Sequence, residues 1–466
     1  MHAPRAAAAG RTASPATARL INDRLALQLL QSEGALSAGQ LTALTGLSRP
    51  TVADLVERLQ KAGLIAVVGE SGTQRRGPNA RLYGIVAERA HLVGLDLRTH
   101  SVTVAVADLL GEVRDERTVP VGADDTPETA VATALAVVDQ ALAAAGAHHP
   151  HTIAVGAPGL VDPATGRLGG TDWIPSWHVA LVEALRTRRA VSVLLENEVH
   201  LAALAEQRDG AARDRDTFVL LWLGHGTGAA VVLDGTLRRG ASGGTGEIGF
   251  LPVPGTAALP SASGCDGGFH SLAGSAAICA LATEHGLLPA GTGTGSKAAH
   301  APSSDSDSDS DSDSESDSGS DSDSESGSDS ESGFAAPPPE IEEADADAPP
   351  AEAVVRAAVS AVSTPAAAAS ASADDAAAFL DALAARIALG VAAVCAVLDP
   401  GCVVLGGEVG RGGGEELAGR VAGQLARLSP LRTDVRAGTV GGRAVLRGAV
   451  LAAREAAQNE LFTSAG

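Results

Sequence analysis

Aromatic side chains are scarce in this sequence. Phe, Trp and Tyr together make up 2% of the 466 residues, and Met occurs once. The buried cores must therefore be built from Val, Leu, Ile and Ala, and hydrophobic residues still make up 45% of the chain. This content is ordinary for a globular protein, and the length predicts two or three domains.

Cysteines and long hydrophobic runs are also few. The four cysteines are Cys265, Cys279, Cys395 and Cys402. Their spacing matches no disulfide framework, which favours a reducing compartment. The longest apolar stretch, residues 387–398, is too short to span a bilayer, and the N-terminus has no apolar signal region. We therefore expect a cytoplasmic protein with no membrane partner.

Positive charge is scarce overall but concentrated at one end. The formal net charge is −22, yet residues 301–350 alone hold 17 acidic residues and no Lys or Arg. Residues 1–89 carry 11 Arg and Lys against 6 Asp and Glu, a net charge of +5. The total charge would disfavour a nucleic-acid partner, but its segregation leaves the N-terminal segment as a candidate DNA-binding region.

The basic segment has the pattern of a winged helix-turn-helix domain, which we place at residues 20–87. Residues 1–19 are predicted to be a disordered tail. Apolar residues at helical spacing then predict three helices, the third capped by Ser48 with Pro50 in its first turn. Two short apolar runs after Gly63, joined by a Gly-rich basic turn, predict a two-stranded wing.

The candidate DNA contacts lie at the start of the third helix and at the tip of the wing. A recognition helix presents its N-terminal polar residues to the major groove, so Ser48, Arg49 and Thr51 are predicted to contact bases or phosphates. Arg75 and Arg76 would suit a narrow minor groove. The alternative is a helical cap domain with a solvated basic face.

From residue 90 onward, strands alternate with helices, which predicts an α/β body over 90–290 and 351–460. Two stretches of it, VGLDLRTHSVTVAVADLLGE and LLWLGHGTGAAVVLDGTLRRG, share one order of strand, polar turn and strand. This weak repeat favours a duplicated fold with a cleft between two lobes.

A Ser/Asp/Glu-rich insertion over 291–350 interrupts the body. Neither the acidic run nor the Pro/Ala-rich residues 335–375 are expected to bury enough apolar surface to offset chain entropy, so the insertion is predicted to be disordered. Three roles stay open for the acidic tract: a solvated spacer, a phosphorylation target, or a competitor for the basic DNA-binding domain.

Several segments in register resemble the ROK family of sugar kinases and sugar-responsive repressors. They are GLDLRTHSVTVAVADLLGE, VGAPGLVD, LLENEVHLAALAE, LGHGTGAAVVLDGTLRRGASGGTGEIG, LDPGCVVLGGEVG and GGRAVLRGAVL. The resemblance implies an α/β, two-lobed hexokinase/actin-like domain, here preceded by an α+β winged helix-turn-helix domain. It also implies a sugar site in the interlobe cleft.

The phosphate-binding loop separates the kinases of this family from its repressors. The kinases carry Asp, any residue, Gly-Gly-Thr, whereas Asp96 is followed here by Leu97, Arg98, Thr99 and His100. The glycines that let backbone N–H groups approach a phosphate are gone. A second glycine-rich loop, 224–228, is either a tight turn between strands or a remnant phosphate loop.

The general-base position is also altered. The family has Asn-Asp there, and this chain has Asn197-Glu198. The carboxylate of Glu198 sits one methylene further out, and a displacement of about 1 Å can cost roughly 10²-fold in rate. The alternative is that these residues only cap the helix that follows.

The resemblance further implies a zinc site in many members, and this sequence has lost its ligands. Phe250 stands where the family has His, and Ser261, Ser263 and Gly268 stand where it has cysteines. We therefore predict no metal and no cofactor. The polar residues left to bind a ligand are Asn197, Glu198, Glu247 and His270.

These features predict a transcriptional regulator, a repressor, and not an enzyme. Its partners would be a double-stranded DNA operator and a sugar or sugar phosphate effector, and it would act as a homodimer or homotetramer. The rivals are an ATP-dependent sugar kinase of the same family, and a regulator whose body has lost sugar binding and serves only for oligomerisation.

Overall fold

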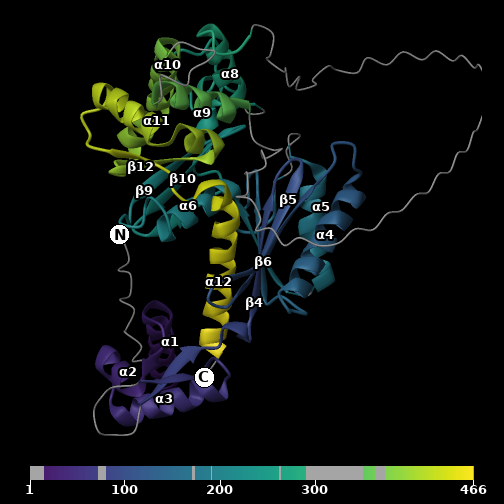
Figure 1. Cartoon of the computed structure of the whole chain (residues 1–466), viewed down its shortest axis with the longest axis vertical. Coiled ribbons are helices and arrows are strands. Elements are labelled where there is room, and N and C mark those ends of the chain that lie inside the picture. Colours follow the sequence, from purple (N-terminus) through teal and green to yellow (C-terminus); the bar gives the residue numbers. More distant parts are fainter. Residues whose placement is uncertain are drawn as a thin grey trace, which may run out of the picture.

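The computed structural model divides the chain into an N-terminal domain and a two-lobed body, with the long helix α12 (Ala444–Ser464) reaching from one to the other (Figure 1). It describes residues 15–71, 80–169, 174–189, 191–261, 264–289, 350–363 and 373–464. The predicted wing-tip residues Arg75 and Arg76, and the predicted insertion apart from Pro350, lie outside these ranges.

The N-terminal domain has the predicted three helices and a small sheet. Its elements are α1 (Pro15–Glu33), β1 (Leu36–Ser37), α2 (Ala38–Thr45), α3 (Arg49–Lys61), β2 (Ile65–Ser71) and β3 (Ala80–Ile85). The sheet order is β1-β3-β2, and β2 and β3 form the antiparallel wing. The prediction of a tail through residue 19 was wrong for residues 15–19, because α1 already begins at Pro15, a residue suited to a first helical turn.

The three helices of this domain pack around leucines. Leu27, Leu41, Leu55 and Leu59 are at most 1% exposed. One ion pair is buried with them: Arg58 of α3 binds Asp23 of α1 at 2.6 Å, and the Asp23 side chain is fully buried. The pair ties the third helix to the first.

The first lobe of the body is built on a five-stranded sheet of order β6-β5-β4-β7-β8. Its strands are β4 (His91–Leu97), β5 (Ser101–Asp108), β6 (Val113–Pro120), β7 (Thr152–Ala157) and β8 (Ser192–Asn197). One face packs on α4 (Pro127–Ala144) and α5 (Ser176–Arg189), and the other on α6 (Glu198–Arg208) and α12.

The second lobe repeats this arrangement with the sheet order β11-β10-β9-β12-β13. Its strands are β9 (Phe218–Leu223), β10 (Thr227–Leu233), β11 (Thr236–Arg238), β12 (Cys402–Gly406) and β13 (Asp434–Ala437). In both sheets the first three strands are antiparallel and the last pairings are parallel. The two similar stretches of sequence form β4–β5 and β9–β10. The duplication predicted from them is therefore present in the topology of the two sheets.

The outer face of the second sheet is covered by helices from the C-terminal half. They are α8 (Ser275–Glu284), α9 (Pro350–Ser363), α10 (Ala373–Leu398) and α11 (Gly407–Leu428). The expectation that residues 335–375 bury too little apolar surface was wrong for α9, because Ala351, Val355 and Ala358 lie on one side of that helix and are buried against the lobe.

The helix α10 is longer than the apolar stretch seen in the sequence. Its 26 residues are apolar enough, by length and composition, to cross a membrane. However, Phe379, Leu383, Ile387 and Val391 along one side are at most 1% exposed within the second lobe. The composition of α10 is thus accounted for by its place in this core.

Candidate functional site

The predicted ligand residues gather where α6 begins, between the two lobes. Asn197 and Glu198 stand at the junction of β8 and α6. Glu247 lies just before a short 3-10 helix (Ile248–Phe250), and His270 starts the short helix α7 (His270–Ala273). His270 lies against Gly249, since a Cβ added at Gly249 would be 3.7 Å from the Cβ of His270.

Asn197 is fixed by the backbone around it. Its side-chain oxygen accepts hydrogen bonds from the backbone N–H of Val199 at 2.8 Å and of His200 at 3.3 Å. Its amide nitrogen donates to the carbonyl of Gly159 at 3.0 Å. Asn197 therefore caps α6, which is the helix-capping role given above as the alternative to ligand binding. It also joins α6 to the loop that contains Gly159. Its contact with a ligand stays a prediction.

Glu198 is the first residue of α6 and is surrounded by other acids. Burial raises the pKa of Glu198 to about 8, with Asp96, Glu408 and Glu247 adding to the rise and Arg98 opposing it. At pH 7 roughly one tenth of this side chain would be ionised. A general base must be deprotonated to act, so this environment favours Glu198 as a hydrogen-bond donor to a hydroxyl oxygen.

A second group beside this position was not foreseen from the sequence. Glu196 binds the Nδ1 of His200 at 2.9 Å with one oxygen and the Nε of Arg239 at 2.6 Å with the other. Burial alone would raise the pKa of Glu196, but the hydrogen bond of His200 and the charge of Arg239 hold it below the usual value. The four-residue spacing of Glu196 and His200 was the signal available; nothing local pointed to Arg239.

Glu247 and His270 both lie in surroundings that are less polar than water. Burial raises the pKa of Glu247, opposed by the charge of His200. Burial lowers the pKa of His270, opposed by Asp266. Electrostatic interactions link Glu247 to Glu198 and to His200. The roles of Glu247 and His270 toward a ligand stay predictions.

No group of three or more His, Cys, Asp and Glu side chains in the described ranges is arranged to hold a metal ion. Phe250 is 40% exposed at the position where the family has a histidine. Of the three residues standing in for the family's cysteines, Ser263 lies outside the described residues.

The start of α3 presents the predicted DNA contacts to solvent. Ser48 caps this helix, accepting from the backbone N–H of Thr51 at 3.4 Å, and the two hydroxyls are 2.8 Å apart. Ser48 and Arg49 are exposed, whereas Val52 and Leu55 of the same helix are buried. The helix thus packs by one face and leaves its N-terminal polar end free, as a recognition helix requires.

Comparison with known proteins agrees with this division. The ROK family matches residues 92–299, and the MarR family matches residues 23–77. The chain therefore carries a ROK-family domain behind a MarR-like winged helix-turn-helix domain. The fold class predicted from the sequence is confirmed for the described residues.

Relatives of the ROK domain include both regulators and kinases. The DNA-binding transcriptional dual regulator NagC of Escherichia coli K12 is 29% identical over 237 residues, which are 50% of this chain and 57% of NagC. A glucokinase of Thermotoga maritima is 34% identical over 167 residues, 35% of this chain and 50% of the kinase. The chain thus matches less than two thirds of the length of these curated relatives.

A solved structure resembles nearly the whole chain. The crystal structure of a ROK family transcriptional regulator, described as a homolog of the E. coli MLC protein, has a TM-score of 0.66 and 19% identity. The match covers 96% of this chain and 98% of that one. At this identity the likeness concerns the fold, including the order of winged helix and ROK domain.

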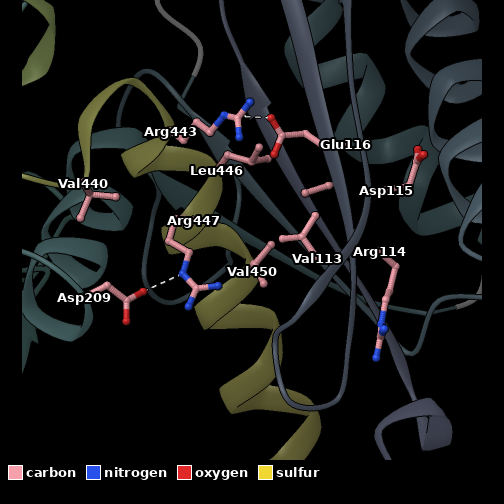
Figure 2. Close-up of a pocket in the computed structure, with 11 residues that line it drawn as sticks. Val113, Arg114, Asp115, Glu116, Asp209, Val440, Arg443, Leu446, Arg447 and Val450 are labelled. Carbon is pink, nitrogen blue, oxygen red and sulfur yellow. Dashed lines mark hydrogen bonds and ion pairs between the residues drawn. The ribbon is translucent and has the colours of Figure 1, made fainter. Parts of the chain in front are cut away.

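A groove of about 630 Å³ lies between β6 and α12, away from Asn197 and Glu198 at the start of α6 (Figure 2). Two ion pairs involve its lining residues. Arg443 binds Glu116 at 3.1 Å, and Arg447 binds Asp209 at 2.6 Å. Arg443, immediately before α12, thus attaches to β6, and Arg447 in the first turn of α12 attaches to the end of α6.

Proposed function

We propose that this chain is a DNA-binding transcriptional regulator, a repressor, that responds to a sugar or sugar derivative bound in the interlobe cleft. The observation that carries the proposal is the joining of a winged helix, whose recognition helix has an exposed Ser48-Arg49 end, to a ROK domain. The naming of relatives as N-acetylglucosamine and xylose repressors supports it.

A continuous set of contacts supports coupling between the cleft and the DNA-binding domain. The helix α6 begins at Glu198 and packs along α12 (Figure 1). Near its other end, buried Glu206 accepts the backbone N–H of Val440 at 2.9 Å, just before α12. At the far end of α12, Asn459 accepts a hydrogen bond from Arg24 of α1 at 2.7 Å.

The proposed mechanism is a shift between two lobe arrangements. A ligand that binds the two arrangements with different affinity changes their populations. The packed pair α6–α12 carries that change to α1, and the Asp23–Arg58 pair carries it on to the recognition helix. In a cytoplasmic homodimer or homotetramer this would alter the spacing of two recognition helices on a palindromic operator.

The rival function is an ATP-dependent sugar kinase, favoured by the likeness to glucokinases. Two observations oppose it: Arg98 is ion-paired where the family has a glycine cradle, and Glu198 is held mostly protonated. A coupled ADP-release assay over a sugar panel tests this; turnover near 1–10³ s⁻¹, roughly the range of ordinary enzymes, would establish the kinase.

Footprinting on genomic DNA fragments with and without a panel of sugars tests the main proposal. We expect protection of a palindromic site that one sugar abolishes or strengthens. Arg49→Ala should lose the footprint while the thermal midpoint is kept. A footprint that no sugar changes, with no sugar-induced thermal shift, would favour a body that serves only for oligomerisation. Absence of any footprint would contradict the regulator.

A further inference from the structure

The carboxylate of Glu408 lies between the turn that joins β4 to β5 in the first lobe and the loop that joins β9 to β10 in the second. Glu408 is the second residue of α11, in the second lobe, and is 8% exposed. One of its oxygens accepts a hydrogen bond from Nη1 of Arg98 at 2.9 Å. Arg98 belongs to the turn between β4 and β5 in the first lobe, so this ion pair joins the lobes.

The other oxygen of Glu408 rests on the second glycine-rich loop. A Cβ added at Gly224 would come within 2.5 Å of this oxygen, so Gly224 leaves the space that the carboxylate fills. Gly407, just before it, has a φ of +77°, and a Cβ there would lie 2.4 Å from the carbonyl oxygen of Leu223. Two glycines therefore set the position of Glu408 against the end of β9.

Arg98 is itself held in place on the first lobe. Its Nε lies 3.3 Å from a carboxylate oxygen of Asp96, and its backbone carbonyl lies 3.1 Å from Nε2 of His178. The Arg98 side chain is 17% exposed. Arg98 thus presents a fixed cation to the second lobe.

A guanidinium, a glycine-rich loop and the first turn of a helix are groups that bind phosphate. Here the anion among them belongs to the chain. We propose that Glu408 is an internal anion that occupies the place of a phosphate group, joins the two lobes and excludes nucleotides and phosphorylated sugars from the cleft. This exclusion implies that the effector is an unphosphorylated sugar, and that implication rests on the proposed function.

The surrounding charge supports the exclusion. The carboxylates of Asp96, Glu247 and Glu408 all act electrostatically on Glu198, with Arg98 as the opposing cation. A phosphate group would bring about two more negative charges next to these carboxylates. A neutral hydroxyl brings none and can accept a hydrogen bond from protonated Glu198.

Calorimetry on the full chain with inorganic phosphate and with ADP tests the proposal. The wild type should bind neither at millimolar concentration. Glu408→Ala removes the second-lobe partner of Arg98 and should bind phosphate at least about tenfold more tightly than the wild type. Adding Arg98→Ala should abolish the gain. Glu415→Ala, which removes an exposed carboxylate from the same helix, is the matched control and should behave as the wild type.

Glu408→Gln gives a second reading if Glu408→Ala fails to fold, because the amide keeps the size and removes the charge. Phosphate or ADP binding by the wild type at the affinity of the Glu408 variants would overturn the proposal. So would a folded Glu408 variant without any gain.

A parallel assay of operator binding, with neutral sugars and their 6-phosphates, separates this proposal from the function. A response to a neutral sugar alone supports both. A response to the 6-phosphate overturns the exclusion and keeps the regulator. No response to either removes the sugar-dependent function, and the phosphate calorimetry still decides the role of Glu408.

Discussion

Two helices of this protein each begin with a polar capping residue followed by an ionisable one, but the two ends lie in different surroundings. The recognition helix α3 begins with Ser48 as its cap and Arg49 as its first residue, both exposed. The helix α6 begins with Asn197 as its cap and Glu198 as its first residue, at a half-buried junction between lobes. In the proposed function, the first end would offer an exposed cation to a polyanion, and the second would offer a protonated acid to a neutral ligand. The surroundings, more than the capping itself, decide what each end can bind.

The largest effect is expected from breaking the ion pair that ties α3 to α1. Arg58→Ala leaves the fully buried Asp23 without the partner recorded at 2.6 Å, which should destabilise the N-terminal domain by about 3–5 kcal/mol. Hydrogen exchange of the α3 amides measures this. Asp54→Ala removes the exposed partner of the same arginine and should cost less than about 1 kcal/mol. Equal effects of the two would mean that the buried pair does not hold α3.

The buried end of α6 should show itself as a pH dependence. The folded pKa of Glu198, about 8, lies above the ordinary value of 4.5. The folded state therefore holds this proton longer than the unfolded state, and its contribution to stability is lost as pH rises from about 4.5 to 8. We expect a loss of roughly 2 kcal/mol between pH 6 and 8.

Glu198→Gln should flatten that part of the profile measured by urea unfolding. Glu415→Gln, at an exposed position on α11, should leave the profile unchanged. A slope that persists unchanged in Glu198→Gln would show that another group titrates.

The exposed end of α3 should act on DNA binding and not on stability. Arg49→Ala should weaken operator binding by about 1–3 kcal/mol and relax specificity at one base pair. Competition binding over single-base operator variants measures both. Arg49→Lys keeps the charge and should retain salt-dependent affinity while losing specificity. Uniform weakening across all operator variants by Arg49→Ala would assign the residue to a phosphate instead.

The smallest effect is expected from the α6 cap. Asn197→Ala removes the acceptor used by Val199 and His200 and should cost about 1 kcal/mol of stability. Asn197→Ser retains an acceptor and should recover most of it. Thermal unfolding gives the comparison, and a loss with both variants would point to the Gly159 hydrogen bond as the main contribution.

Local pattern was enough to predict much of the fold. The strands β4, β5 and β9 lie in the region predicted to alternate strands with helices, because each is an apolar run closed by polar or glycine residues. The Ser48 cap was predicted because the hydroxyl that accepts the hydrogen bond, on Ser48, and the N–H that donates it, on Thr51, are only three residues apart in the sequence. Such features depend on neighbours in sequence, which a single chain displays directly.

Features made by distant residues could not be predicted in this way. Arg98 and Glu408 are 310 positions apart, and nothing in the turn 96–101 indicates its partner. The pairing of Glu196 with Arg239 is hidden for the same reason. The helix α9 was missed because alanine-rich sequence becomes ordered only where a lobe surface is present to cover it.

The helix α12 has one more consequence, which follows from its length. Its 21 residues span about 30 Å at the rise of an α-helix. Anchored at its start by Arg443 and Arg447, it is a lever arm whose far end rests on α1. A tilt of about 5° at the anchored end moves the far end by about 3 Å over that length, the length of one hydrogen bond. A lobe movement too small to change the shape of the cleft visibly is thus large enough to take a recognition helix out of register with its base pairs.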